Sequence, residues 1–417
     1  MRFLWVFFIL LFIFDFYVYR VLKYVLAAKS RPFRLLILCL YWVFSGVFLL
    51  GLAAFPIIPF ESVHPAFKSY FLALLIGSFF SKLLACLFFL ADDIRRGIIA
   101  LKRRFSSKKE KEYKNGEPVS RSAFLSWLGL GVGASLLGTF TYGFTNKYNY
   151  QVRRQELSFK NLPDAFKGLK IVQISDIHVG SFHDKAAVAS GIEQILSLNP
   201  DLIVVTGDLV NDHAEEMDNY KELFKLLRAP MGVYSILGNH DYGLYAIPQH
   251  FSEDRRNGRI KENTEKLIHL HEHLGWKLLM NENRIFEKNG DKIALLGVEN
   301  WGAKGNFPKY GKLEKAHSGT ENIEFKILLS HDPSHWDAEV LQNYKDINLT
   351  LSGHTHGMQF GVETPGFKWS PVQYMYERWA GLYTEGNQKL YINRGFGFIG
   401  YPGRVGIMPE ITEIVLS

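Results

Sequence analysis

Two short stretches decide the fold of the second half of the chain: residues 170–178, KIVQISDIH, and residues 202–208, LIVVTGD. Each is an apolar, β-branched run that ends in polar residues, Asp176 and His178 in the first and Asp208 in the second. Such runs are typical of buried strands. The loops at the carboxyl ends of strands are where α/β sheets build their sites. The two stretches therefore predict an α/β sheet with a functional site along one edge.

The same arrangement recurs further along the chain. The later motifs are Gly238-Asn239-His240-Asp241, Ser330-His331-Asp332 and Gly353-His354-Thr355-His356, which follow apolar runs at 233–237, 325–330 and 349–352. Apolar residues at helical spacing occupy 185–197, 218–227 and 262–274. We expect a β-sandwich flanked by helices, with all five motifs along one edge.

The five motifs supply the ligands that a two-metal centre needs. The seven candidate ligands are Asp176, His178, Asp208, Asn239, His331, His354 and His356. A carboxylate has two oxygens and can bridge cations about 3.5–4 Å apart, so Asp208 is predicted to be shared. Metal one would take Asp176, His178, Asp208 and His356, and metal two Asp208, Asn239, His331 and His354. These mixed nitrogen and oxygen shells suit Mn, Fe, Zn, Co or Ni better than Ca or Mg.

One histidine of the motifs, His240, is left over for catalysis. Two divalent cations would activate water against phosphorus and neutralise the charge of the transition state. His240 is predicted to protonate the leaving oxygen or to donate a hydrogen bond to it, with Asp241 as its orienting partner. The predicted reaction is therefore metal-dependent hydrolysis of a phosphoester or pyrophosphate.

The first third of the chain has a different character. Four long apolar stretches cover residues 3–19, 35–60, 69–91 and 122–145, and a membrane span needs about 20 such residues. We therefore predict three transmembrane helices within 1–91, a basic cytoplasmic linker at 92–121, a fourth transmembrane helix at 122–145, and the α/β domain at 151–417. Buried helices of a soluble protein are rarely this long. A cleaved signal peptide would explain the first stretch alone, and Asp15 within it argues against that reading.

Loop charge predicts the orientation of these helices. Residues 92–121 hold ten Lys and Arg, whereas the turn at 57–66 holds none. Because basic loops stay on the cytoplasmic side, the N-terminus and the α/β domain are both predicted outside the cytoplasm. Asp15 and Lys82 lie within the apolar stretches, where unpaired charge is costly, so we expect them to pair.

The remaining composition excludes one partner class. Residues 1–150 hold 19 of the 48 Lys and Arg and 7 of the 41 Asp and Glu. Residues 151–417 therefore hold 29 basic and 34 acidic residues. The soluble half is thus mildly acidic, and a nucleic-acid partner is not expected. The two cysteines, Cys39 and Cys86, lie in the apolar stretches and do not identify the compartment.

In the order and spacing of its motifs, the region 168–417 resembles the calcineurin-like metallophosphoesterases. Their signature of D-x-H, G-D, G-N-H-[DE], H and G-H-x-H is matched in all five blocks, from Asp176 to His356. The resemblance implies a four-layer α/β/β/α sandwich. The tail, with Asn393-Arg394-Gly395 and Arg404, resembles the bacterial membrane-anchored branch, which implies an inner or plasma membrane location. Arg394 and Arg404 are candidates for contacting a substrate phosphate, with structural pairing to acidic residues as the alternative.

Several functional alternatives stay open at this point. Within the family that the chain resembles, the substrate would be a lipid-linked or other envelope phosphoester, or UDP-2,3-diacylglucosamine in lipid A synthesis. A non-catalytic membrane sensor or scaffold would be expected to lack ligands, and none is missing. The aromatic segment 367–379 is either an apolar surface that grips a lipid or ordinary packing under a loop, and packing is favoured.

Overall fold

The computed structural model describes residues 2–54, 63–105, 120–248 and 250–417. The chain divides into two compact units, Met1–Tyr142 and Gly143–Ser417, and each is considered by itself. Most of the turn predicted at 57–66, and residues 106–119 of the predicted basic linker, lie outside the described residues.

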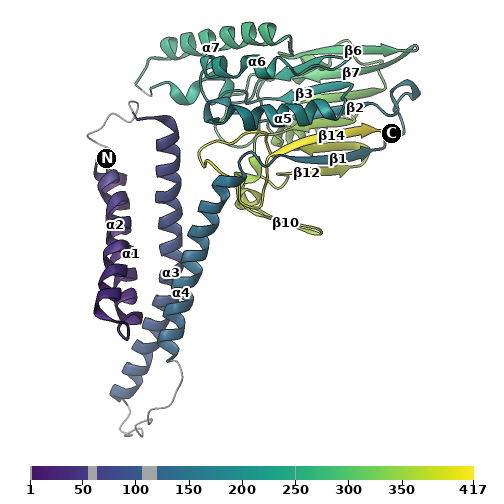
Figure 1. Cartoon of the computed structure of the whole chain (residues 1–417). Coiled ribbons are helices and arrows are strands. Elements are labelled where there is room, and N and C mark those ends of the chain that lie inside the picture. Colours follow the sequence, from purple (N-terminus) through teal and green to yellow (C-terminus); the bar gives the residue numbers. More distant parts are fainter. Residues whose placement is uncertain (1, 55–62, 106–119, 249) are drawn as a thin grey trace. The chain divides into compact units, whose positions relative to one another are not determined.

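The first unit contains the expected helices (Figure 1), which are α1 (Arg2–Val25), α2 (Arg31–Ala54), α3 (Pro65–Phe105) and α4 (Arg121–Gly143). All four are long and apolar enough to cross a membrane, which confirms the predicted all-α membrane region. The helix α3 continues 14 residues beyond the predicted end at Ala91. Asp92 pairs with Arg95 and Arg96 one turn later, and such pairs support a helix where apolar character ends.

A buried ion pair links two of these helices. Lys82 Nζ on α3 lies 2.6 Å from Asp15 Oδ1 on α1, and both side chains are buried. Ser45 and Tyr41 of α2 also donate hydrogen bonds to Asp15 Oδ1, at 2.5 Å and 2.7 Å. The expected pairing of Asp15 with Lys82 is therefore present, and it removes most of the cost of burying either charge alone.

The second unit is a sandwich of two six-stranded sheets. In spatial order the first sheet contains β1 (Gln151–Leu157), β14 (Glu410–Leu416), β2 (Lys170–Ile174), β3 (Leu202–Thr206), β4 (Val233–Ile236) and β5 (Lys277–Leu278). The second contains β12 (Gly381–Glu385), β13 (Gln388–Ile392), β9 (Leu349–Ser352), β8 (Phe325–Leu329), β7 (Asp291–Gly297) and β6 (Glu282–Lys288). A hairpin of β10 (Val362–Thr364) and β11 (Phe367–Trp369) stands apart from both.

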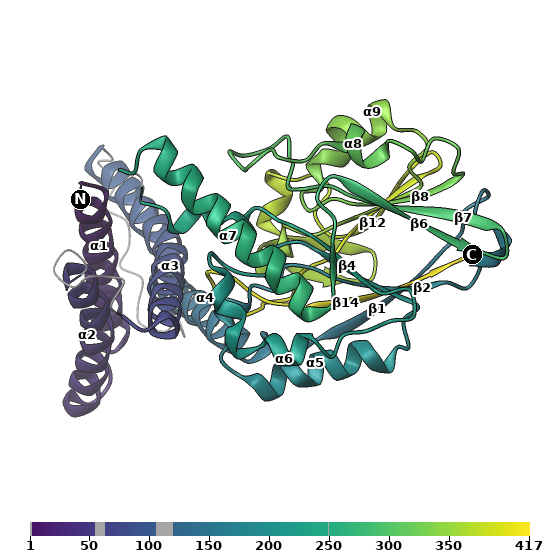
Figure 2. The same ribbon diagram turned by 90° about the horizontal axis from the view of Figure 1, so that it is seen from above.

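Helices cover the outer face of each sheet. The first sheet carries α5 (Lys185–Ser197), α6 (Lys221–Phe224) and α7 (Glu253–Leu274), and the second carries α8 (Leu313–His317) and α9 (Leu341–Asn343) (Figure 2). One apolar core lies between the sheets, with Ile171, Val204 and Leu351 at its centre. Two further cores lie under the helices. This is the four-layer α/β/β/α arrangement that the sequence resemblance implied.

Strand direction brings the sequence motifs to one place. β2, β3 and β4 are parallel in the first sheet, and β8 and β9 are parallel in the second. Their carboxyl ends lead directly into Asp176, Asp208, Asn239, His331 and His354, respectively. The motifs therefore meet along one edge of the sandwich, as expected for sites in α/β sheets.

Two predicted helices differ from those observed. The helix expected at 218–227 is a 3₁₀ segment, Ala214–Asn219, followed by the single turn α6. The helix α7 begins at Glu253 instead of Glu262. Its first turns are exposed and polar, so they show no apolar periodicity, and exposed pairs such as Arg259 with Glu262 run along them.

Candidate metal centre

The candidate ligands are held on an unusual backbone. Five of the seven lie in the left-handed region, with φ of 50° at Asp176, 49° at His178, 56° at Asp208, 71° at His354 and 49° at His356. Non-glycine residues rarely adopt this conformation, which costs about 1 kcal/mol or more each. Such strain concentrates at functional sites, where the surrounding structure maintains it. The loops after the strands thus turn their side chains inward to one point.

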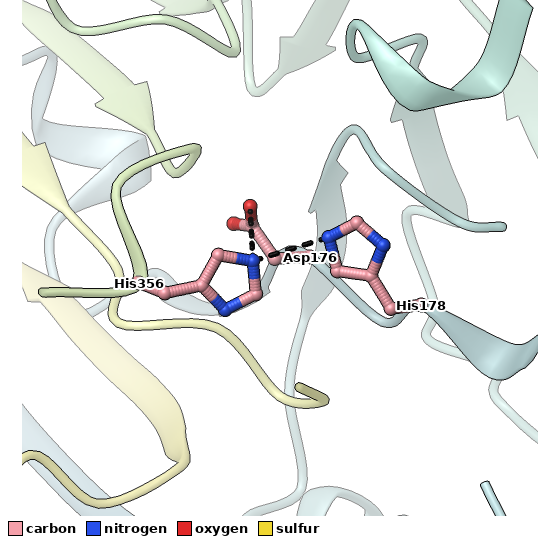
Figure 3. A group of neighbouring side chains, drawn as sticks. All are labelled: Asp176, His178 and His356. Atoms are coloured by element: carbon pink, nitrogen blue, oxygen red, sulfur yellow. Dashed lines mark hydrogen bonds and ion pairs between the residues drawn. The ribbon is translucent and has the colours of Figure 1, made fainter. Parts of the chain in front are cut away.

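Asp176, His178 and His356 form the first group of side chains (Figure 3). His356 Nε2 lies 3.2 Å from Asp176 Oδ1 and 3.1 Å from His178 Nε2. The two imidazole rings are stacked, with centroids 5.0 Å apart. All three side chains are buried. Their three donor atoms therefore face one common point.

Asp208, His331 and His354 form the second group. His331 Nε2 lies 3.1 Å from Asp208 Oδ2, and His354 Nδ1 lies 3.3 Å from His331 Nε2. The side-chain oxygen of Asn239 joins them, 2.8 Å from His354 Nδ1 and 3.2 Å from His331 Nε2. The predicted second set of ligands is thus brought together, including its neutral amide.

Asp208 connects the two groups. Its Oδ2 lies 3.1 Å from His331 Nε2 in the second group and 3.6 Å from His178 Nε2 in the first. Its Oδ1 accepts a hydrogen bond of 2.8 Å from the backbone N–H of His240, which fixes the plane of the carboxylate. One carboxylate therefore reaches both candidate positions, as a bridging ligand must.

The donor set fits a pair of divalent cations. The Nε2 atoms of His178 and His356 are close enough to bind one cation together with Asp176, and imidazole nitrogen is a common ligand of transition metals. Glycines leave the space that the ligands occupy. A Cβ on Gly238 would lie 2.2 Å from Asp208 Oδ1, and one on Gly353 would lie 2.2 Å from Asp176 Oδ2. The backbone is thus shaped around the carboxylates.

The electrostatics of the site are those of a buried, charge-paired cluster. Burial opposes ionisation of Asp208, but the neighbouring His331 and His240 hold its pKa well below the usual value. Burial lowers the pKa of His178 well below its usual value. For His331 the same burial is outweighed by Asp208, and its pKa is raised to about 10. The carboxylates are therefore ionised at neutral pH, as metal ligands must be.

His240 lies beside the cluster as predicted, but its orienting partner differs from the prediction. The ring Nδ1 lies 2.8 Å from the backbone oxygen of Asn211. Because a carbonyl oxygen only accepts hydrogen bonds, Nδ1 must carry a proton and donate a hydrogen bond to the Asn211 oxygen. The other ring nitrogen, Nε2, is left for a second partner. The ring also packs against His178 and Tyr245, with centroids 4.9 Å and 4.5 Å away.

The predicted role of Asp241 as orienter of His240 is wrong. Its carboxylate is buried and accepts hydrogen bonds from the backbone N–H groups of Asp208, Leu209, Val210 and Gly238. It points back into the turn that carries Asp208. Asp241 therefore fixes the loop on which the shared carboxylate stands, and the sequence could not distinguish this role from that of an orienter.

The predicted phosphate contacts of Arg394 and Arg404 are also not supported by the structure. Both side chains are buried. Arg394 pairs with Glu410 and Glu363, each at 2.6 Å. Arg404 donates to backbone oxygens, among them that of His356 at 3.2 Å. The alternative of structural pairing is correct for Arg394, and Arg404 supports the loop that carries His356.

Two further aromatic residues contact the cluster, Tyr376 of the aromatic segment 367–379 and Phe307, which the sequence did not single out. Tyr376 Oη lies 3.0 Å from His354 Nε2 and donates to Asp332 Oδ2 at 3.2 Å. His354 thus directs Nδ1 at the cluster and Nε2 at Tyr376. The ring of Phe307 packs edge-on against His354, 4.8 Å away between centroids. Tyr376 belongs to the aromatic segment 367–379, in which Tyr376 and Trp379 are buried in a small core whereas Phe367 and Tyr374 are 59% and 78% exposed, so neither reading of the segment accounts for all of it.

Access to the cluster is confined to one side. Of the seven candidate ligands and His240, only His240 and His354 are partly exposed. Tyr245, 51% exposed, flanks the first, and Phe307 flanks the second. The two partly exposed residues of the site, His240 and His354, are therefore each in contact with an aromatic side chain.

Two family models match the chain. Residues 1–147 match "Probable Calcineurin-like phosphoesterase, transmembrane domain", and residues 169–358 match "Calcineurin-like phosphoesterase". The second match includes all seven candidate ligands. The first match covers the helical unit, and the second lies within the unit that contains the two sheets.

Similar proteins come from animals and bacteria. The "Uncharacterized metallophosphoesterase YkuE" of Bacillus subtilis is 31% identical over 72% of this chain and 98% of its own length. The "Transmembrane protein with metallophosphoesterase domain" of Danio rerio is 30% identical over 63% of this chain, which spans only 56% of that relative. The "UDP-2,3-diacylglucosamine pyrophosphatase LpxG" of Chlamydia trachomatis is 29% identical over 57% of this chain and 81% of its own length.

Proposed function

The chain belongs to the calcineurin-like metallophosphoesterases, and from this membership we propose that it is a membrane-anchored hydrolase with two metals that acts on a lipid-linked or other envelope phosphoester or pyrophosphate. The observation that carries the proposal is the position of Asp208. Its single carboxylate lies between two groups of buried ligands, one with Asp176, His178 and His356 and the other with Asn239, His331 and His354.

The ligand groups and His240 divide the work of hydrolysis. When bound, two divalent cations would polarise the phosphoryl oxygens, activate water and neutralise developing negative charge. Asp208, which reaches both ligand groups, would be the ligand that the two cations share. His240 would act in its imidazolium form: Nδ1–H donates to the Asn211 carbonyl, and Nε2–H gives its proton to the leaving oxygen. The metals would be Mn, Fe, Zn, Co or Ni, the cations that mixed nitrogen and oxygen shells accept.

Two features support a lipid-linked substrate. The chain carries four helices that are long enough to cross a membrane, so the domain is tethered to a bilayer. The accessible side of the cluster is flanked by Tyr245 and Phe307, and apolar walls with a few polar groups are typical of small-molecule sites. Such walls suit a substrate with an apolar or ring-containing leaving group beside its phosphate.

A second candidate substrate is UDP-2,3-diacylglucosamine. This substrate is favoured by the similarity to the chlamydial protein LpxG, which is named as a UDP-2,3-diacylglucosamine pyrophosphatase. It is disfavoured by the orientation that loop charge predicts, since this substrate is cytoplasmic and the domain is expected outside. A candidate of another class, a non-catalytic membrane sensor or scaffold, is disfavoured because no ligand is missing from the two groups.

The test of catalysis compares purified full-length protein with Asp208→Asn. With Mn²⁺ added, wild type should hydrolyse bis-p-nitrophenyl phosphate, and the variant should be slower by about 10³-fold or more, because shared charge is worth several kcal/mol in a two-metal site. The matched control is Asp218→Asn, an exposed aspartate that pairs with Lys221. Equal rates for wild type and Asp208→Asn would support the scaffold instead.

The substrate is then identified by product analysis. A panel of envelope phospholipids and nucleotide-linked lipids, including UDP-2,3-diacylglucosamine, is offered to wild type and Asp208→Asn in detergent. Release of UMP that depends on Asp208 would establish the pyrophosphatase reaction. Cleavage of an envelope lipid without UMP release would establish the reaction proposed above.

A further inference from the structure

The membrane unit contains a polar pocket that neither the metal centre nor the family match explains. Its volume is about 160 Å³, and it lies between α1, α3 and α4. Tyr17 and Tyr24 line it from α1, Asp92 and Arg96 from α3, and Ser126 from α4. Sites that enclose a whole small molecule have volumes of roughly 300–1,000 Å³, so this pocket suits one end of a larger ligand.

The pocket lies at the level where the apolar stretches end. On α3, residues 83–91 carry no charge, and Asp92 follows them directly. On α4, which begins at Arg121, Ser126 belongs to the second turn. On α1, Tyr24 belongs to the last turn. Tyrosine and arginine side chains gather at this level of membrane proteins, where they meet lipid headgroups. The pocket is therefore reached most directly from the headgroup layer.

One positive charge at the pocket is in excess. Asp92 pairs with Arg95 at 2.7 Å and with Arg96 at 3.2 Å. Asp93, which also lines the pocket, pairs with Arg96. The guanidinium of Arg20 lines the pocket too, and within the part of the chain that the structure describes it makes no ion pair and no hydrogen bond. Three arginines therefore meet two aspartates, and the unmatched charge favours a ligand with one negative charge.

Two hydroxyl groups of the lining can still donate hydrogen bonds. The hydroxyl of Ser126 makes none to any other described residue and is open to the pocket. Tyr24 Oη approaches Ser120 Oγ at 3.5 Å, which is longer than a normal hydrogen bond between hydroxyls. The hydroxyl of Tyr17, by contrast, already donates to Asp93 at 2.6 Å. The free donors therefore lie on α1 and α4, on the same pocket as the unmatched guanidinium.

We propose that this pocket binds the phosphodiester headgroup of an anionic glycerophospholipid of the phosphatidylglycerol kind. The single negative charge of the phosphodiester matches the one excess positive charge. Arg20 donates to the phosphate oxygens, and Ser126 and Tyr24 add hydrogen bonds. The acyl chains stay in the bilayer beside the helices. A zwitterionic headgroup gains less, because it brings a cation of its own next to Arg20. The inference is independent of the metal centre.

The place of the pocket favours a lipid over a soluble phosphodiester. The same end of the unit carries the start of α2 at Arg31 and the basic residues that follow Ala91, so loop charge predicts that it faces the cytoplasm. Anionic lipids give the cytoplasmic leaflet its negative surface potential and are attracted by arginine near the surface. The bilayer also holds a lipid beside the pocket, whereas a soluble ligand loses its translational freedom on binding.

The experiment measures lipid binding to delipidated full-length protein in detergent by native mass spectrometry. The probes are palmitoyl-oleoyl phosphatidylglycerol, phosphatidylcholine with the same chains, and glycerophosphoglycerol, which has the same headgroup without chains. Wild type should bind phosphatidylglycerol about tenfold more tightly than phosphatidylcholine, as expected for charge-assisted hydrogen bonds to an unmatched cation. Equal affinity for the two lipids would overturn the proposal. Glycerophosphoglycerol that binds as tightly as the lipid would also overturn it, in favour of a soluble phosphodiester.

Matched variants locate the binding. Arg20→Gln should lower the affinity for phosphatidylglycerol about tenfold and leave that for phosphatidylcholine unchanged. Lys23→Gln removes the same charge from an exposed residue of α1 that does not line the pocket, and it should change neither affinity. Ser126→Ala should weaken phosphatidylglycerol binding about fivefold, whereas Ser135→Ala, at an exposed position of the same helix, should not.

Elution volume and circular dichroism report that each variant is folded. Equal losses in Arg20→Gln and Lys23→Gln would reduce the preference to general surface charge and overturn the site. Unchanged binding in both Arg20→Gln and Ser126→Ala would overturn it as well.

Discussion

The left-handed backbone at the ligands limits which substitutions test their chemistry. Asp208 has φ of 56°, a conformation that asparagine accepts more readily than alanine does. Asp208→Asn therefore removes the charge while it keeps the turn. An alanine at the same position would add backbone strain to the lost ligand, and the two effects could not be separated.

His240 is predicted to act on the substrate and not on the metals. His240→Ala should lower turnover by about 10²–10⁴-fold, the usual contribution of a general acid, because the proton donor to the leaving oxygen is lost. Metal content measured by plasma mass spectrometry should stay near two ions per chain. His213→Ala, an exposed histidine on the loop after Asn211, is the control. Loss of metal from His240→Ala would show that His240 is a ligand.

Tyr376 is predicted to hold His354 in its metal-binding orientation. Its hydroxyl joins His354 Nε2 to Asp332, and removal of such outer partners weakens metal binding by about 10–100-fold. Tyr376→Phe should therefore raise the Kd for Mn²⁺ at one of the two sites, measured by titration calorimetry. Tyr374→Phe, a change at a side chain that is 78% exposed, supplies the matched control. Unchanged affinity in Tyr376→Phe would limit the tyrosine to packing.

At the scale of the element, α7 carries a histidine that links stability to pH. His271 is buried against β4, where its Nδ1 lies 2.7 Å from the Leu267 carbonyl and its Nε2 3.1 Å from Ser235 Oγ. Burial lowers its pKa from 6.5 to about 4. Between these values the unfolded chain binds a proton that the folded chain does not. Stability is therefore complete above pH 6.5 and falls as the pH drops toward 4.

This loss can be measured by urea unfolding of the full-length protein in detergent at several pH values. It should be at most about 1.4 kcal/mol per pH unit within the window. His271→Gln cannot take up the proton and should lose this part of the pH dependence. His269→Gln, on the exposed face of the same helix, should keep it. The same slope in both variants would exclude His271 as the cause.

The sequence predicted those elements whose burial is uniform. β3, β4 and β9 are predicted within one residue, because each is an unbroken buried run. β1 was missed, because Gln151–Leu157 is an edge strand with an exposed, charged surface and pairs only with β14. Its strand character comes from that partner, which lies more than 250 residues away. No local pattern contains this information.

The same distinction holds for the site. The seven candidate ligands could be predicted because each follows a strand whose direction and end are visible in the sequence. Tyr376 could be assigned only to the aromatic segment 367–379, because it lies in a loop 22 residues after His354 and no periodicity predicts its contact with that ring. The orienting contact of His240 is a backbone carbonyl, so the identity of the side chain at Asn211 does not reveal it. Asp241 was misassigned because a neighbour in sequence is not necessarily a neighbour of the ring.

At the scale of the whole molecule, the main prediction concerns the side of the membrane on which the metal centre lies. Loop charge places the domain outside the cytoplasm. A reporter that is active only outside, fused after Ser417, should therefore be active, and a reporter that fluoresces only in the cytoplasm should be dark there. The same two reporters inserted after Gly116, in the loop predicted to be cytoplasmic, should give the opposite result. The reporter that is active outside should be inactive, and the fluorescent reporter should be bright. A cytoplasmic signal after Ser417 would overturn the orientation and favour the nucleotide-linked substrate.

The order of strands in the first sheet also constrains when the domain can fold. β14 lies between β1 and β2 and pairs with both, so β1 cannot join the sheet until residues 410–416 have been made. Glu410 at the start of β14 also neutralises Arg394. The first sheet can therefore be completed only after residues 410–416 have been synthesised, and until then the edge of β2 that β14 will cover has no strand beside it.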